Sequence, residues 1–434
     1  MRMSRKKIII LGAGLAGLSA AWHLQKKKTE CFIFEKESGV GGLCRSKKIK
    51  GFTFDCDGHL LHFRNKYTRK LVGKLLNGNL ASHRRSAWIN SFGIFSRYPF
   101  QVNLSALPEP IARECLLGFL KVCQSGPGAH PSNLLQWINS TFGKGIARHF
   151  MVPYNEKFWT VPLNEMISIW TSNFVPQPKP SEVIKGYFAQ NRNRFGYNAT
   201  FWYPRHGGIG QLPQAFERQL CNIFKNCRIS AIDLHKKELD VAGNGRIKFD
   251  TLISTMPLPE LLKIIRKLPG DISDMFKKLR WNSIFNLNLG IEGICQEGRH
   301  WIYFPHKETV FFRVGFFHNF SNQASPRGMS SIYTETAYPQ NKPLDKNKIV
   351  QKVINDLKAS GILGKKNRVS VLDINDIKYG YPIYDKHYLR ATSAIREFLL
   401  CNNIIACGRY GSWKYMSMED AILDGKEAAD RAIK

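Results

Sequence analysis

A continuous apolar run near the start of the chain, residues 8–11, is typical of a strand buried in a parallel sheet. Gly12, Gly14 and Gly17 follow this run and open a segment whose apolar spacing is helical. A second apolar run at 31–34 predicts the next parallel strand. The pattern therefore predicts a strand, a glycine turn, a helix and a second strand.

The spacing of apolar residues changes twice in the rest of the chain. Between residues 107 and 150 the apolar positions recur with helical spacing, which predicts a helical insert. From 284 to 338 apolar and polar residues alternate, with many aromatic residues, which predicts antiparallel strands. The strand-like stretches 249–254 and 403–409, and the helix-compatible tail from Ala421, predict that the chain returns twice to its first sheet.

These elements predict an α/β protein whose first domain is discontinuous. We assign residues 1–75, 200–265 and 390–434 to that domain, which contains the glycine turn. Residues 76–199 are predicted to form a mainly helical insert, and residues 266–389 an antiparallel-sheet substrate domain.

The glycine turn has the residue types that a dinucleotide requires. Gly12 permits a tight turn, Gly14 lets the backbone approach a pyrophosphate, and Gly17 lets the helix pack closely on the strand. The N-terminus of the helix stabilises the bound anion. Glu35 ends the second strand, where its carboxylate can accept hydrogen bonds from ribose hydroxyls. A turn that only packed a helix would not need Glu35, so we predict dinucleotide binding.

A second glycine element follows at Gly41 and Gly42, with Arg45 close behind. Paired glycines allow close backbone approach, and an arginine can neutralise phosphate. This stretch resembles the segment that follows the acidic residue in the flavin amine-oxidase superfamily. The resemblance implies FAD as the cofactor and a Rossmann-like FAD-binding domain.

The charge and the cysteine content limit the expected binding partners and the expected cellular location. The chain carries 64 Lys and Arg against 33 Asp and Glu, a formal charge of +31, which attracts polyanions, anionic lipids and phosphorylated small molecules alike. Aromatic residues do not interleave with arginines, so we expect no nucleic-acid partner, while peripheral membrane contact stays open. The 10 cysteines form no C-x-x-C pair or metal-ligand cluster. We therefore expect no metal, and with no signal peptide or membrane segment in the pattern, a cytoplasmic location.

Eight further motifs carry candidate binding chemistry, because a planar base requires stacking and placed hydrogen bonds while phosphates favour guanidinium groups. In chain order they are Phe54-Asp-Cys-Asp57-Gly58-His59, Arg97-Tyr98-Pro99-Phe100-Gln101, Pro153-Tyr154-Asn155-Glu-Lys-Phe-Trp159, Tyr197-Asn198, Gly207-Gly208-Ile-Gly210, Phe311-Phe312-Arg313, Gly380-Tyr381-Pro382 and Gly408-Arg409-Tyr-Gly-Ser-Trp-Lys-Tyr415. Together and in this order they resemble the UDP-galactopyranose mutase family, most closely its eukaryotic-type branch, over most of the chain.

The resemblance implies a role for each matched residue. The flavin would contact His59, Gly208 and Arg409. The substrate-binding residues would be, on the uridine side, Tyr98, Phe100, Gln101, Asn155 and Trp159 and, on the diphosphate side, Asn198, Arg313, Tyr381 and Tyr415. The residues in catalytic positions would be His59, Arg313, Tyr381 and Tyr415.

Two positions depart from the family pattern. A second diphosphate arginine of the family falls, by counting from Trp159, at Phe174 in this chain. The segment after Tyr415 is also shortened, at 416–420. The first departure puts the phosphate affinity or the choice of substrate in doubt, and the second changes groups that the resemblance places near the pyrimidine end of the flavin.

Three functions are compatible with these features. The resemblance implies a nucleotide-sugar mutase, in which reduced FAD forms an adduct with the sugar and the ring contracts without net redox change; NAD(P)H is a candidate reductant. The alternative is a net oxidoreductase like amine oxidases or protoporphyrinogen oxidase. The third is a basic flavin-containing binding protein without turnover.

Overall fold

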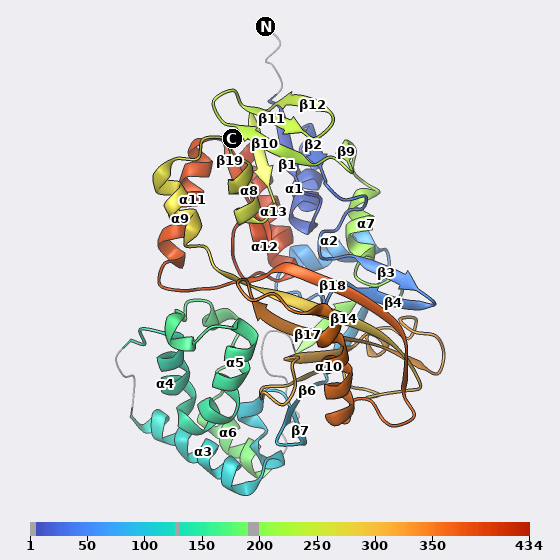
Figure 1. The fold of residues 1–434 in the computed structure, drawn as a ribbon, viewed down its shortest axis with the longest axis vertical. Coiled ribbons are helices and arrows are strands. Elements are labelled where there is room, and N and C mark those ends of the chain that lie inside the picture. The colour runs from blue at the N-terminus through green and yellow to red at the C-terminus, as the bar shows by residue number, and fades with distance from the viewer. Residues whose placement is uncertain (1–5, 126–129, 190–198) are drawn as a thin grey trace.

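The computed structural model describes residues 6–125, 130–189 and 199–434. A five-stranded sheet with strand order β19-β13-β1-β2-β9 lies in the upper part of Figure 1. Its strands are β1 (Ile8–Leu11), β2 (Cys31–Phe34), β9 (Ile223–Phe224), β13 (Thr251–Ser254) and β19 (Ile404–Ala406), and every pairing is parallel. Because β13 and β19 return from distant parts of the sequence, the first domain is discontinuous in the chain.

Helices and small sheets surround this parallel sheet. The contact between helices α1 and α13 is extensive. The helices of this part are α1 (Leu15–Lys26), α2 (Lys66–Leu76), α7 (Gln211–Glu217), α8 (Leu258–Ile264), α9 (Gly270–Lys277), α11 (Tyr388–Cys401), α12 (Gly408–Gly411) and α13 (Met418–Ala432). The short strands are β3 (Ser46–Ile49), β4 (Phe52–Asp55), β5 (Ala81–Arg84), β8 (Thr200–Tyr203), β10 (Ile229–Asp233), β11 (Glu238–Val241) and β12 (Gly245–Lys248).

A second, seven-stranded sheet crosses the middle of the molecule, with strand order β18-β14-β17-β16-β15-β6-β7 (Figure 1). Its strands are β6 (Ala87–Ser91), β7 (Ile94–Arg97), β14 (Trp281–Glu292), β15 (Trp301–Tyr303), β16 (Arg313–Phe316), β17 (Met329–Pro339) and β18 (Arg368–Pro382). All pairings are antiparallel except that of β15 with β6. Helix α10 (Lys346–Ala359) contributes Val353 and Leu357 to the apolar core beneath it.

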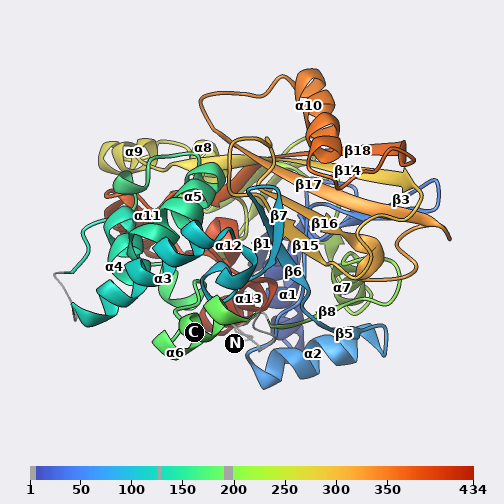
Figure 2. The ribbon, with the colours of Figure 1, turned by 90° about the horizontal axis from the view of Figure 1, so that it is seen from below.

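The helical insert forms a separate bundle at the lower left of Figure 1. It contains α3 (Glu109–Gln124), α4 (Leu134–Ile146), a π-helical turn (Ala147–Met151), α5 (Val152–Trp159) and α6 (Pro180–Phe188). Seen from below in Figure 2, these helices gather on one side of the molecule, and α10 lies apart from them. The insert therefore meets the rest of the protein along one side, and α5 is the helix that faces the sheet.

The predicted α/β fold class is confirmed, since a parallel sheet, a helical insert and an antiparallel sheet are all present. Two details differ from the expectation. Strands β6 and β7, within the stretch predicted to be mainly helical, extend the large sheet, because residues 87–91 alternate between buried and half-buried positions. The polar residues of β14, such as Asn282, Asn286 and Asn288, are buried rather than solvated, because other elements cover both faces of this strand. The domain boundaries themselves remain our proposal.

Among the residues that the structure describes, no helix combines the length and the apolar character needed to cross a bilayer.

Candidate functional site: a flavin turn beside an aromatic and arginine cluster

The glycine turn connects β1 to α1 and has little room for side chains. Gly12 has φ 95°, in the left-handed region that favours glycine. A Cβ on Gly17 would collide with the carbonyl oxygen of Gly12, so only glycine allows the helix to pack this closely. Around Gly14, in contrast, a Cβ would meet no atom within 4 Å. The space beside Gly14 is therefore open to a ligand at the point where α1 begins.

The N-terminus of α1 is suited to an anion. The helix begins at Leu15 without a side-chain cap and without an acidic residue in its first turn. Free N–H groups and the helix dipole attract phosphate at such an end. Glu35 lies next to the turn, where its carboxylate accepts the backbone N–H groups of Ala13 (2.8 Å) and Glu37 (2.9 Å). These bonds orient Glu35 and leave other lone pairs for ribose hydroxyls.

The second glycine element lies directly against the first. Gly41 pairs with Gly14 in an isolated bridge, and Gly42 has φ 58°. A Cβ on Gly42 would approach the Cα of Gly14 to 3.4 Å, so the two glycine segments are in contact. The half-buried Arg45 follows, and its backbone carbonyl accepts the N–H of Cys56 (2.9 Å). The two elements thus form one surface of backbone atoms with an arginine beside it.

A buried carboxylate holds a third glycine segment in place. Asp55 accepts hydrogen bonds from Ser46 Oγ (2.6 Å), Tyr203 OH (2.6 Å) and the backbone of Ile209 (3.1 Å). Burial raises the pKa of Asp55 to about 6, although these three donors oppose the shift. Gly208 has φ 70°, and a Cβ there would collide with Ser46 and Asp55. This network fixes the predicted flavin-side glycine next to the β3–β4 hairpin.

Two predicted flavin contacts carry buried polar atoms that the described residues leave without a hydrogen bond. They are Nδ1 of His59 and Nε of Arg409. Arg409 uses its other nitrogens to donate to the carbonyls of Met416 (3.0 Å) and Gly380 (3.3 Å). Burial, and then the charge of Arg409, lower the pKa of His59 to about 4, so this imidazole is neutral at physiological pH. Buried donors and acceptors of this kind are normally satisfied, and a bound flavin fits this requirement.

Arg409 also forms the centre of an aromatic group. Its guanidinium lies 4.4 Å from the ring centroid of Tyr381 and 4.9 Å from that of Tyr415, and the two rings stack at 5.5 Å. Tyr303 lies 5.2 Å from Tyr98 and 5.4 Å from Tyr154, measured between ring centroids. We call the following residues the aromatic–arginine cluster: Tyr98, Tyr154, Tyr303, Arg313, Tyr381, Arg409 and Tyr415.

Electrostatic interactions also link members of this cluster. The pKa of Tyr98 is raised by burial and further by Tyr303, and Tyr415 contributes as well. The pKa of Tyr415 is likewise raised by burial and lowered by Arg409 and Arg313. Phenols that are kept neutral in this way can donate hydrogen bonds to an anion. The cluster therefore offers phenol donors and two guanidinium groups close together.

Arg313 is already engaged with a carboxyl group. Its Nε and Nη2 donate to the two oxygens of Glu335, the second bond measuring 2.6 Å, and the Glu335 side chain is fully buried. Burial raises the pKa of Glu335 to about 8 against the opposing charge of Arg313. A phosphate at this site would meet an arginine whose charge is partly compensated.

The predicted uridine-side residues lie at different depths. Phe100 is buried and stacks on Phe150 at 4.9 Å, and Phe150 stacks on Tyr154 at 5.6 Å, so Phe100 forms a layer behind the cluster. The amide of Gln101 donates to the carbonyl of Pro176 (2.8 Å), while its Oε1 is buried without a partner among the described residues. Only Tyr98 of this segment belongs to the cluster itself.

Helix α5 carries the other two predicted uridine-side residues. Asn155 donates to the carbonyl of Met151 (2.7 Å), one turn earlier. Trp159 is fully buried, lies 5.9 Å from Tyr381 between ring centroids, and its indole N–H has no partner in the described part of the chain. Trp159 thus packs against the cluster, whereas Asn155 interacts within its own helix.

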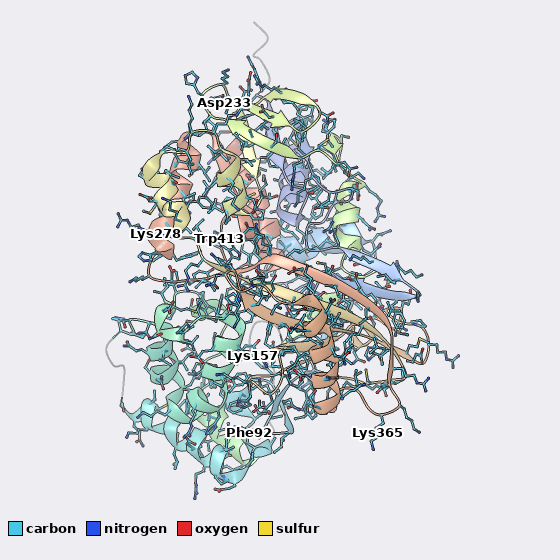
Figure 3. All side chains as sticks on the ribbon, in the orientation of Figure 1. Phe92, Lys157, Asp233, Lys278, Lys365 and Trp413 are labelled. Carbon is cyan, nitrogen blue, oxygen red and sulfur yellow. The ribbon has the colours of Figure 1, made fainter. Side chains whose placement is uncertain are left out.

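A buried lysine attaches α5 to the large sheet. Lys157, labelled in Figure 3 where the insert meets the sheet, donates to the carbonyls of Phe304 (2.9 Å) and His306 (2.7 Å) and to Oγ1 of Thr309 (3.0 Å). These acceptors lie in the connection between β15 and β16, just before Arg313. One ammonium group therefore links the helix of Trp159 to the strand of Arg313.

The position that lacks the expected arginine is aromatic in the structure as well. The ring of Phe174 is nearly perpendicular to that of Tyr415, with ring centroids 4.3 Å apart. An uncharged aromatic ring thus packs against the cluster where the family resemblance implies a second positive charge. The remaining predicted diphosphate residue, Asn198, lies outside the described residues.

Several residues of the site were not predicted as such. Tyr303, Glu335 and Phe158 join it, and Phe158 lies 4.5 Å from Tyr381 between ring centroids. Asp57 belongs to a motif that drew attention only to His59. Glu335 had a detectable signal, because a glutamate within the otherwise uncharged strand 329–339 is unusual for a buried strand.

Comparison with known proteins now assigns the family. The model of the flavin containing amine oxidoreductase family matches residues 15–433. The chain belongs to this family. Membership implies a flavin cofactor, and the glycine turn and the unpaired buried nitrogens fit one.

Individual proteins similar to this chain carry names of different activities. The structure of reduced UDP-galactopyranose mutase superposes with a TM-score of 0.93 at 27% identity, over 99% of this chain and 95% of that one. Putrescine oxidase bound to putrescine has a TM-score of 0.68 at 17% identity, with 99% of each chain covered, and shows a shared fold only. Rat (Rattus norvegicus) prenylcysteine oxidase 1 is 29% identical over 119 residues, and the chain spans only 23% of its length.

Proposed function

We propose that the protein is an FAD-dependent nucleotide-sugar mutase that interconverts pyranose and furanose forms of a UDP-sugar. The observation that carries this proposal is the packing of Tyr381 and Tyr415 on Arg409, with Tyr98 and Arg313 in electrostatic contact with Tyr415. A uracil ring requires a stacking surface, and two phosphates require cationic and phenolic donors. The likeness to reduced UDP-galactopyranose mutase supports the same assignment, and the eukaryotic-type branch remains part of the proposal.

The chemistry of each residue suggests its role. Tyr98 and Trp159 would bind the nucleobase end, and Arg313, Tyr381 and Tyr415 would hold the departing diphosphate through charge-assisted hydrogen bonds. His59, held neutral by burial, would orient the flavin edge through Nδ1. When bound in its reduced form, FAD supplies the nucleophile for the sugar. The protein would supply orientation and would exclude water.

A direct assay tests this function. Protein reduced with dithionite under anaerobic conditions is mixed with UDP-galactopyranose and UDP-galactofuranose, and the products are separated by chromatography. We expect interconversion with the reduced protein and none with the oxidised protein. Tyr98→Ala should weaken UDP binding about fivefold, because stacking contributes on the order of 1 kcal/mol. Phe188→Ala, at an exposed position, is the matched control. Absence of conversion for every UDP-sugar would exclude the mutase.

A net oxidoreductase of the amine-oxidase type is the second candidate. Phe174 in place of an arginine and the compensation of Arg313 by Glu335 favour it, since both make the site less cationic. The relatives include an amine oxidase and prenylcysteine oxidase 1. Steady oxygen consumption with an amine or an apolar substrate, without any need for an added reductant, would identify this activity.

A further inference from the structure

A cavity lies where the helical insert meets the rest of the protein. Its volume is about 520 Å³, and its walls come from the start of α4, the segment 164–167 after α5, the end of α9 and the connection between β18 and α11. Lys278, labelled on the left of Figure 3, lines it at the end of α9. A volume of this size accommodates a small molecule. Of the described residues that line it, none belongs to the aromatic–arginine cluster.

Backbone contacts hold the walls of this cavity together. The N–H of Leu134 donates to the carbonyl of Met166 (2.7 Å), and the N–H of Ile167 donates to the carbonyl of Tyr384 (2.7 Å). Met166 also pairs with Asp385 in an isolated antiparallel bridge. These bonds fix the start of α4, the segment 164–167 and the β18–α11 connection relative to one another. The cavity is therefore formed before any ligand binds, which lowers the entropic cost of binding.

The two carboxylates that line the cavity are both in contact with Arg280. Its Nη1 lies 2.9 Å from a carboxylate oxygen of Glu165 and 3.6 Å from one of Asp385. Asp385 is buried, and its other oxygen accepts the backbone N–H of His387 (2.9 Å). The negative groups of the cavity thus have partners within the protein.

Three lysines add positive charge to the same cavity. Lys277 pairs with the exposed Asp274 (2.9 Å). Lys278 is half-buried and Lys386 is exposed, and neither forms an ion pair within 4.0 Å with a residue in the described part of the chain. With Arg280, four cationic side chains face two carboxylates, so the cavity favours an anion.

The neutral lining residues narrow the class of anion. Ser132 and Asn164 provide a hydroxyl and an amide, which can donate hydrogen bonds to phosphate or sugar oxygens. Among the described lining residues there is no Phe, Tyr or Trp on which a nucleobase could stack. Lysine ammonium groups bind phosphate as point charges. The lining therefore fits a small phosphorylated molecule better than a nucleotide.

We propose that this cavity binds a small phosphorylated molecule through Lys278 and Lys386, at a site distinct from the aromatic–arginine cluster. The inference does not rest on the proposed mutase function. The β18–α11 connection contacts both places, because Asp385 lines the cavity and the hydroxyl of Tyr384 accepts the backbone N–H of Tyr415 (2.6 Å). A ligand in the cavity would thus link the insert and α9 to the segment that holds Tyr415.

Calorimetric titration of the FAD-bound protein with inorganic pyrophosphate tests the site. Lys278→Met and Lys386→Met, made together, should weaken pyrophosphate binding about tenfold, because an exposed ion pair contributes about threefold and two are removed. Lys365→Met with Lys366→Met removes the same charge from two exposed lysines. Lys365 lies on the opposite side of the view in Figure 3, so this control should bind pyrophosphate as the wild type does.

An added lysine tests the site in the opposite direction. Asn164 is exposed and lines the cavity, so Asn164→Lys should tighten pyrophosphate binding about threefold. Asn244→Lys adds the same charge at an exposed position between β11 and β12 and should leave the affinity unchanged. Salt should weaken pyrophosphate binding more in the wild type than in the double lysine variant, because two of the screened charges are then absent.

The outcomes separate this cavity from other sites that bind phosphate. Equal pyrophosphate affinity in the wild type and the double lysine variant would place the anion elsewhere and overturn the proposal. Co-sedimentation with phosphatidylglycerol vesicles is measured in parallel. Loss of vesicle binding in the double variant, with pyrophosphate binding unchanged, would assign the lysines to a lipid surface and would also overturn it. Weakened pyrophosphate binding in a protein that converts no UDP-sugar would support the cavity site and contradict only the mutase.

Discussion

The glycine turn and the aromatic–arginine cluster, the two candidate binding regions, are built from different parts of the chain. The turn consists of backbone from two short segments that lie within the first 42 residues, and its glycines exclude side chains. The cluster consists of side chains from β15, β16, β18, α5 and α12, together with Tyr98 after β7 and Tyr415 after α12. Local sequence therefore specifies the turn, whereas the cluster depends on how distant elements pack. The two regions should respond differently to substitution.

The largest effect is expected when the cluster loses Arg313. Arg313→Met would leave the fully buried Glu335 without its partner, which costs about 3–5 kcal/mol in the free energy of unfolding. Because burial raises the folded-state pKa of Glu335, its contribution is present below its ordinary pKa and is lost as the pH rises through about 8. At pH 5 the carboxyl group is neutral and needs no counter-charge, whereas at pH 9 it is ionised and depends on Arg313. Denaturant unfolding should accordingly show a larger loss at pH 9 than at pH 5.

The double variant provides the control for Arg313→Met. Adding Glu335→Gln should restore much of the lost stability, since no charge then remains buried. Equal losses at the two pH values, with no recovery in the double variant, would contradict the assigned ion pair.

In the glycine turn, substitutions of Gly14 and Gly17 should affect stability and flavin binding differently. Gly17→Ala places a Cβ against the carbonyl of Gly12 and should cost about 3 kcal/mol, with loss of bound flavin. Gly14→Ala meets no protein atom within 4 Å, so the apoprotein should keep its stability. Flavin affinity should nevertheless fall in Gly14→Ala, because the backbone approaches the pyrophosphate there. Thermal unfolding of the apoprotein and flavin titration measure the two effects, and equal stability losses would contradict the geometry.

A smaller effect is expected where Lys157 joins the insert to the sheet (Figure 3). Lys157→Met leaves three acceptors without their donor and should cost about 2 kcal/mol. Burial lowers the pKa of Lys157 to about 7, so its contribution is present above its ordinary pKa of 10.5 and is lost as the pH falls through about 7. The wild type should therefore gain stability between pH 7 and pH 10, and the variant should lack this gain.

Substrate binding should separate a positioning role of Lys157 from a purely structural one. If α5 must be aligned with β16, Lys157→Met should raise the apparent Kd for UDP in the folded protein, and Lys157→Arg should restore it in part. Lys263→Met, at an exposed ion pair, is the matched control. Unchanged UDP affinity would assign Lys157 to stability alone.

The smallest effect concerns the chemistry of the cluster rather than its stability. Phe174→Arg places a guanidinium beside Tyr415 and should tighten UDP binding by about 1 kcal/mol, with a steeper dependence on salt. Phe188→Arg makes the same change at an exposed phenylalanine and should leave UDP affinity unchanged. Weaker UDP binding in Phe174→Arg would indicate that the phenylalanine ring contacts the ligand. It would favour a less anionic substrate.

The sequence predicts those elements whose determinants are local. The strands at 8–11 and 31–34, the glycine turn and the terminal helix are found at the expected places, because apolar period and glycine placement act over a few residues. The addition of β6 and β7 to the large sheet was not predicted, since β6 pairs with β15 from a distant part of the chain. Phe100 shows the same limit, because a matching motif cannot reveal that Phe150 lies between Phe100 and Tyr154 of the cluster.

By itself, the sequence determined the first strand, glycine turn and helix of an α/β fold and predicted that a dinucleotide binds there, because Gly12, Gly17 and Glu35 lie close together in the chain. Only the tertiary structure decided that Glu335 pairs with Arg313 and that Phe174 packs against Tyr415. The reason is physical: burial and electrostatic contact depend on distances between segments far apart in the chain, and local patterns contain no information on those distances.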